Sequence, residues 1–282
     1  MAAVGLALLS ALLFGAMSVA LRMALQREPD AALATIATVV PAIAVALAAA
    51  AAEAPARGLH LGGAWPFLLA GLLSPGAAQI LVTLAIRDSG ASRVSMVFGT
   101  APLVSVTIAL AVLGEPVRVP LIAGAVLVVA GGVELARERE RPGHLRRIGL
   151  LYALAGAALF ATRDNLVRHL AVGRTAVPPA VAAAAALIGG GAVVVVWARR
   201  WISRRWLPFV PAGLFFGGSY VSLFEAYYRG RVTVVAPLVA VESLVGVVLS
   251  IVFLRDSERV GKRLILGAAL IVAGGALIGA YR

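Results

Sequence analysis

The sequence AGAVLVVAGG at residues 123–132 returns as LGAALIVAGG at residues 266–275. Seven of the ten positions are identical, and the offset of 143 residues is about half of the 282-residue chain. A second echo relates ALLFGAMSVALR at residues 11–22 to AALFATRDNLVR at residues 157–168. Both pairs fall inside long apolar runs, so the repeat predicts two similar halves embedded in a membrane. Such a duplication is typical of carriers, whose binding site lies between two units that move against each other.

The composition indicates a chain that lies in lipid. Apolar residues make up 61% of the sequence and charged residues 13%, which is about half the charged fraction of a soluble domain. The net charge is +12, but the arginines lie between hydrophobic runs, so we expect lipid headgroups as their partners and no nucleic acid. The sequence contains no cysteine, which excludes disulfides, thiolate metal sites and cysteine nucleophiles. We expect no catalytic residues, no cofactor and no metal site.

The apolar runs between charged residues predict the helices. A helix that crosses a bilayer needs about 20 apolar residues. Ten runs qualify, at residues 2–21, 31–52, 64–86, 92–113, 119–136, 148–170, 178–198, 206–228, 232–254 and 264–281. The longest charged connection, at residues 137–147, separates five runs from five. We therefore predict an all-α integral membrane protein with ten transmembrane helices, organised as a first repeat (1–136), a connecting loop (137–147) and a second repeat (148–282).

The odd number of helices in each repeat determines the predicted topology. A tandem copy of five helices enters the membrane from the opposite side, so the two repeats are inverted and both termini lie on the same face. The connections on one face carry 17 arginine and lysine residues, against seven on the other face. The positive-inside rule then predicts that both termini face outwards.

This organisation resembles the drug/metabolite transporter superfamily, in particular its carriers with two EamA domains. The resemblance covers essentially the whole chain and depends on the LLFG segment at residues 12–15, on LGE at 113–115 and on the Gly-rich ends of the two halves. The second half departs from the family pattern, because RDSE at residues 255–258 replaces a Gly-Glu pair and Glu242 is followed by Ser243 rather than proline.

The resemblance implies a multi-pass protein of the prokaryotic plasma membrane. Its substrate would be a small polar metabolite of the amino acid, nucleoside, sugar or cationic drug type, moved by alternating access around a midplane cavity. It also implies cytoplasmic termini, contrary to the charge distribution, so the side of the termini stays open. The alternatives are a flippase for a lipid-linked substrate with the same fold, and an integral-membrane transferase. A transferase needs clustered carboxylates or His and Ser nucleophile sets, whereas the three histidines here are scattered.

Ionisable side chains inside the predicted spans are the first candidates for substrate binding, since each costs at least about 2.5–3.5 kcal/mol in the hydrocarbon layer. Glu242 lies ten residues into its span, close to the middle of the membrane at about 1.5 Å per residue. It could bind a cationic group of the substrate, or take up a proton and couple transport to protons. The alternative is a hydrogen bond to a neighbouring helix or exposure to a wet cavity wall.

A second charged group interrupts the second half at Arg163, Asp164 and Asn165, where the repeat alignment has Met17-Ser18-Val19 in the first half. Asp164 and Arg168 are spaced i,i+4 and can pair, which would leave Arg163 free to bind a carboxylate or phosphate of the substrate. The alternative is that all three charges lie at the membrane interface, with Arg163 extending to the headgroups.

The remaining candidates for substrate binding are Ser74, Gln79, Tyr220 and Glu225. The alternative for the uncharged residues is hydrogen bonding between helices, which is common and modest in energy. Glu225 precedes a charged turn and is more typical of an interface residue. The Pro75-Gly76 step predicts a kink or break that frees backbone carbonyls. The GxxxG pattern at residues 275–279 can pack within one chain or between two, so a monomer and a homodimer both stay open.

Overall fold

The computed structural model describes residues 2–112, 119–136, 147–172, 177–199, 204–254 and 261–280. All regular structure in this part of the chain is helical, which confirms the predicted all-α fold. The first half contains α1 (Ala2–Arg27), α2 (Ala31–Arg57), η1 (Leu61–Gly63), α3 (Trp65–Gly71), η2 (Leu72–Ala77), α4 (Ala78–Ser89), α5 (Ala91–Phe98), α6 (Ala101–Val112) and α7 (Val119–Ala136). The second half contains α8 (Arg147–Val172), α9 (Pro179–Ala198), η3 (Arg204–Phe209), α10 (Val210–Arg229), α11 (Val232–Val239), α12 (Glu242–Phe253) and α13 (Lys262–Ala280).

Helical segments occupy the positions of the predicted spans. By length and composition, five of them within the described residues could cross a membrane, namely Ala2–Arg27, Ala31–Arg57, Trp65–Ser89, Pro179–Ala198 and Arg205–Arg229. Polar residues fix some of their ends. Asp30 precedes α2, and its Oδ1 accepts hydrogen bonds from the backbone N–H groups of Ala32 and Leu33 at 3.0 and 3.1 Å, which satisfies two donors that a helix start leaves unpaired.

Three of the segments are broken near their middle. Ser74 has non-helical backbone angles (φ −147°, ψ 117°) directly before Pro75. Of the two outcomes left open for Pro75-Gly76, a kink or a break, the structure shows an interruption of the helical backbone. Two further breaks were not predicted and are alike. Helices α5 and α11 have eight residues each, α6 and α12 have twelve each, and each pair is joined by a two-residue turn.

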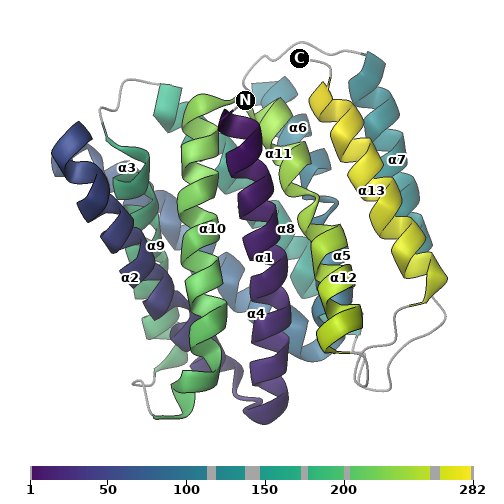
Figure 1. The fold of residues 1–282 in the computed structure, drawn as a ribbon, viewed down its shortest axis with the longest axis horizontal. Helices are drawn as coiled ribbons and strands as arrows, with labels where there is room; N and C mark the ends of the chain where they lie inside the picture. The colour runs from purple at the N-terminus through teal and green to yellow at the C-terminus, as the bar shows by residue number, and fades with distance from the viewer. Residues whose placement is uncertain are drawn as a thin grey trace.

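The main helix contacts join the two halves. Helix α1 packs on α10 and α12, while α8 packs on α4 and α6. Helices α1 and α8 are the first helices of the two halves. Each therefore packs on helices of the opposite half, and the partners of α8 in the first half correspond to the partners of α1 in the second. Helix α2 packs on α9 at one edge of the bundle and α7 packs on α13 at the other, as Figure 1 shows. The start of α1 and the end of α13 lie at the same end of the bundle (Figure 1).

The two copies of the repeated segment lie in α7 and α13 and contact each other through glycines. A Cβ atom on Gly131 would lie 2.6 Å from the carbonyl oxygen of Gly267, and one on Gly274 would lie 2.5 Å from that of Gly124. Such close approach of backbones requires small residues at the crossing. Gly124 and Gly267 are equivalent in the repeat, as are Gly131 and Gly274, so the contact has approximate two-fold symmetry.

Candidate functional site

A small cavity in the middle of the bundle contains most of the charged candidates. Arg163 and Asp164 reach it from α8, and Glu242 reaches it from the start of α12. The rest of the lining is mainly apolar and aromatic, with one hydroxyl: Phe14, Phe98, Ala101, Ser105, Phe160, Leu223, Ala236, Val239 and Ala240. The space open to a water-sized molecule is about 40 Å³, enough for a few waters. The site is therefore closed in this conformation.

Arg163 is the most deeply buried charge of the site, with 1% of its surface exposed. Its Nη2 lies 3.0 Å from Oδ1 of Asp164. Three aromatic rings surround the guanidinium, at 5.0 Å (Phe160), 4.6 Å (Tyr220) and 5.7 Å (Phe224) from the ring centroids. Each such contact contributes roughly 0.5–2 kcal/mol. Within the described residues, Nε and Nη1 have no hydrogen-bond partner, so the guanidinium keeps donors for a further ligand.

These contacts correct two interpretations made from the sequence. Arg163 does not extend to the headgroups, because its side chain is enclosed within the bundle. It also does not point away from Asp164 but pairs with it. The guanidinium of Arg168 instead donates to the backbone oxygen of Tyr227 at 2.9 Å.

Glu242 occupies a different environment from Asp164. It is the first residue of α12, directly after the two-residue turn that follows α11. The partial positive charge at a helix start favours a carboxylate there. Glu242 is 7% exposed and interacts electrostatically with both Arg163 and Asp164. Within the described residues it makes no hydrogen bond or ion pair, so it is the carboxylate most available to a ligand.

A second, smaller cavity of about 10 Å³ adjoins the first. The two cavities share Phe14, Phe98, Phe160 and Glu242, so Glu242 is flanked by three phenyl rings. The ring centroids of Phe160 lie 6.0 Å from Phe14 and 5.5 Å from Phe98. These three rings were not among the residues predicted from the sequence to bind substrate. The signal was present for two of them, because Phe14 and Phe160 are the shared phenylalanines of the second echo.

Three uncharged candidates support this cluster. The hydroxyl groups of Ser74 and Tyr220 lie 3.3 Å apart, which connects the break before Pro75 to the ring that covers Arg163. Gln79 lines the smaller cavity. Its Nε2 contacts Sδ of Met17 at 4.0 Å, and its Oε1 has no hydrogen-bond partner among the described residues.

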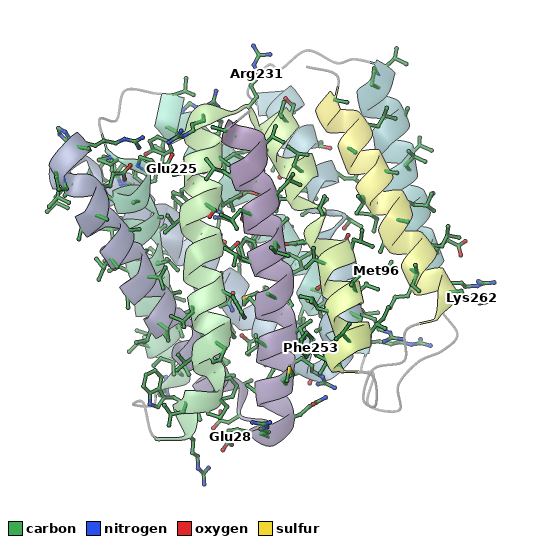
Figure 2. The ribbon with its side chains drawn as sticks, viewed as in Figure 1. Glu28, Met96, Glu225, Arg231, Phe253 and Lys262 are labelled. Carbon is green, nitrogen blue, oxygen red and sulfur yellow. The ribbon has the colours of Figure 1, made fainter. Side chains whose placement is uncertain are left out.

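Like Ser74 and Tyr220, the last two candidates, Asn165 and Glu225, do not line either cavity. The side-chain amide of Asn165 donates to the backbone oxygens of Ser105 and Ala161 at 3.1 and 3.0 Å, so it ties α8 to α6. Glu225 lies towards one end of the bundle (Figure 2), where it forms ion pairs with Arg57 at 3.1 Å and with Arg229 at 2.7 Å. Within the described residues, no group of three or more His, Asp or Glu side chains could hold a metal ion.

Comparison with known proteins identifies the family. The family model described as the EamA-like transporter family matches residues 1–134 and again residues 147–280. A solved crystal structure shares the fold with a TM-score of 0.71 and 22% sequence identity, over 98% of this chain and 95% of that chain. No match to the chain is found among curated proteins. The chain belongs to the EamA-like transporter family, a group of membrane transporters of the drug/metabolite transporter superfamily.

Proposed function

We propose that the protein is a secondary carrier that moves a small polar metabolite with a cationic group across the plasma membrane. The observation that carries the proposal is the buried carboxylate of Glu242, which has no ion pair among the described residues and is flanked by phenyl rings. Arg163 and Asp164 neutralise each other, so the site has a net charge of −1 when Glu242 is ionised. A monocation would restore neutrality, and aromatic faces attract cations.

The membrane arrangement proposed here has ten crossing segments in two inverted repeats, residues 1–136 and 148–282. Several observations support it. The family model matches the two halves separately. Helices α1 and α8, the first of each half, pack on corresponding helices of the opposite half. The start of α1 and the end of α13 lie at the same end of the bundle (Figure 1). Both termini would then lie on one face of the membrane. A reporter fused to the C-terminus would distinguish the outward side favoured by the arginines from the cytoplasmic side implied by the family.

The size of the cavity supports alternating access. Sites for small molecules usually measure about 300–1,000 Å³, whereas the central cavity offers about 40 Å³. A metabolite can therefore enter only if the helices around the cavity move apart. The cross-half contacts of α1 and α8 make this site the natural pivot for two rocking halves.

Larger hollows occur on the outside of the bundle, but their chemistry does not suit a polar substrate. The lining of the hollow between α2 and α9 consists of Ala, Leu, Ile and Val side chains only. A polar metabolite bound there would lose its hydrogen bonds to water without replacement. A lipid-linked substrate would suit this apolar hollow, so a flippase remains the second candidate. The transferase has less support, because the two carboxylates of the cavity are not accompanied by a histidine.

The proposal can be tested in two steps with purified protein. A thermal-shift screen against amino acids, polyamines, organic cations, sugars and nucleosides would find ligands, because binding to the folded state raises apparent stability. The best ligand would then be loaded into proteoliposomes to measure flux down its gradient. We expect a cationic or zwitterionic ligand and vectorial movement. Chemical conversion of the ligand without movement would contradict the proposal and favour the transferase.

Replacement of Glu242 by glutamine tests the role of the carboxylate. Loss of one charged hydrogen bond to a cationic ligand costs about 1.5–3 kcal/mol, or roughly 10- to 150-fold in affinity. Glu225→Gln is the matched control, because it removes a carboxylate that lies outside the cavity. If the two variants bound the ligand equally well, the assignment of Glu242 would be wrong. If flux by Glu242→Gln kept the pH dependence of the natural protein, proton coupling through this residue would also be excluded.

A further inference from the structure

An apolar hollow beside α9 has the form of a lipid site. It lies between α2, α3 and α9 and has a volume of about 620 Å³, within the range of small-molecule sites. All twelve lining residues are Ala, Leu, Ile or Val, and six of them are alanines. The small alanine side chains on α2 and α9 are what leaves the space empty. The helices that form its walls are long and apolar enough to cross a membrane, so this hollow opens towards the acyl chains.

The length of the hollow fits within one leaflet of a bilayer. On α2 its lining residues run from Leu47 to Ala54, and Leu59 and Leu61 line it beyond the end of the helix. Seven helical steps span about 10 Å at 1.5 Å per residue, which is less than half of a hydrocarbon core of about 30 Å. Along α9 it extends from Val181 to Ile188. Glu53 of α2 accepts a hydrogen bond from the backbone N–H of Ala180 at 3.1 Å. The C-terminal end of α2 and the N-terminal end of α9 therefore lie together at the mouth of the hollow.

The mouth carries groups that suit a phospholipid headgroup. Trp65 follows the lining residue Ala64 and is 61% exposed, and tryptophan is enriched at the membrane–water interface. The side chain of Arg57 is 44% exposed. Its ion pairs with Glu53 and Glu225 both use Nη1, so the guanidinium retains donors for a phosphate. The carboxylates of Glu53 and Glu225 beside it can accept further hydrogen bonds from the ammonium of a zwitterionic headgroup, in addition to those from Arg57, Arg229 and the backbone N–H of Ala180.

We propose that this hollow binds one acyl chain of a phosphatidylethanolamine-type phospholipid, with the phosphate at Arg57 and the ammonium at Glu53 and Glu225. The site is separate from the central cavity, and its occupation does not depend on which metabolite is carried. A lipid bound there would fix α3 and α9 against α2 in one leaflet. The class of ligand follows from the apolar lining, the one-leaflet depth and the paired charges at the mouth.

The test measures lipid retention and affinity in detergent. The full chain would be purified, titrated with phosphatidylethanolamine and analysed by native mass spectrometry. Ala51→Phe would fill the hollow from an exposed position. Val196→Phe, at a 74% exposed position in a different hollow of α9, is the matched control. We expect a saturable lipid adduct that weakens at least about tenfold in Ala51→Phe and is unchanged in Val196→Phe.

Two results would overturn the proposal. One is the absence of a saturable adduct in the natural protein, and the other is equal affinity in Ala51→Phe when that variant elutes as a folded monodisperse species. Diacylglycerol with the same chains serves as the probe of the headgroup, because it lacks the phosphate. Weaker binding of diacylglycerol, and loss of this difference in Arg57→Gln, supports the assignment of Arg57. Equal binding of both lipids to the natural protein would contradict it.

Discussion

Replacement of Arg163 by leucine tests whether the buried ion pair behaves as the structure implies. Leucine fills part of the same space between the aromatic rings but leaves Asp164 as a buried carboxylate without its partner at 3.0 Å. At this distance, and with an effective dielectric constant of about 20, the lost attraction amounts to about 5–6 kcal/mol. Truncation of one member of a buried pair costs about 3–5 kcal/mol in measured cases. We therefore expect Arg163→Leu to lower the free energy of unfolding by about 3–5 kcal/mol.

The double variant Arg163→Leu/Asp164→Leu separates the pair from the burial of each side chain. Replacement of both members of a buried pair by apolar residues is often neutral or stabilising. The double variant should therefore recover at least about 2 kcal/mol relative to Arg163→Leu alone. Such recovery would assign the cost of the single variant to an unpaired carboxylate rather than to a cavity.

The assay is equilibrium unfolding by a denaturing detergent, followed by the fluorescence of the four tryptophans. Arg205→Leu is the control, because Arg205 is 75% exposed and lies 3.7 Å from Glu28. An exposed pair of this kind is worth about 0–1 kcal/mol. A loss in Arg163→Leu no larger than the loss in Arg205→Leu would refute the reasoning. It would mean that the Arg163–Asp164 contact forms in a solvated rather than a buried environment.

Three further predictions follow from individual contacts. Gly71→Ala should cost about 1–3 kcal/mol of unfolding free energy, because its Cβ would lie 2.0 Å from the carbonyl oxygen of Ala186, whereas Gly5→Ala meets open space and should cost nothing. Ser10 and Ser219 exchange hydroxyl–carbonyl bonds of 3.1 and 2.9 Å between α1 and α10, so a double-mutant cycle with alanine should give a coupling of about 0.6 kcal/mol. Ser105→Cys, in a chain without other cysteines, should react with a membrane-impermeant maleimide at least about tenfold more slowly than Arg231→Cys in the connection between α10 and α11. Ser105 is buried and Arg231 is exposed, so Ser105 is reached by opening the bundle. Equal rates would contradict a closed cavity.

The positions of the helical segments could be predicted from the sequence, because a helix that crosses the hydrocarbon layer needs about 20 apolar residues. An irregularity at Pro75, either a kink or a break, was also predictable, since proline removes a backbone donor. The turns at residues 99–100 and 240–241 were not predicted, although each interrupts an apolar run of sufficient length. Proline lies close to both turns, at Pro102 and Pro237, but a proline in a membrane helix indicates a kink, a break or neither. Only the neighbouring helices decide between them.

The charged candidates of the cavity were selected because charge is rare in an apolar span and therefore conspicuous. The phenyl rings were missed for the opposite reason, because apolar side chains are common in these spans and nothing in the sequence distinguishes those that line a cavity. Glu225 was selected on the same criterion as Glu242, yet it lies in an ion-pair cluster with Arg57 and Arg229. The position of a residue along a helix gives its depth in the membrane, but not the direction in which its side chain points. Depth favoured Glu242, near the middle of its span, over Glu225, which precedes a charged turn, but it did not show which side chains face the cavity.

The two adjoining cavities suggest how the halves have specialised. Under the repeat alignment Met17 and Ser18 stand where the second half has Arg163 and Asp164. The first pair lines the smaller cavity and the second pair lines the larger one. The shared phenylalanines of the echo, Phe14 and Phe160, line both. If the halves are inverted repeats, as proposed, one ancestral site has been kept twice, with neutral groups in one copy and an ion pair in the other. A symmetric carrier would have two equal cavities, whereas in this chain the Arg163–Asp164 pair lines the larger cavity and Glu242 lines both. The substrate should therefore bind off the symmetry axis, on the side of α8 and α12.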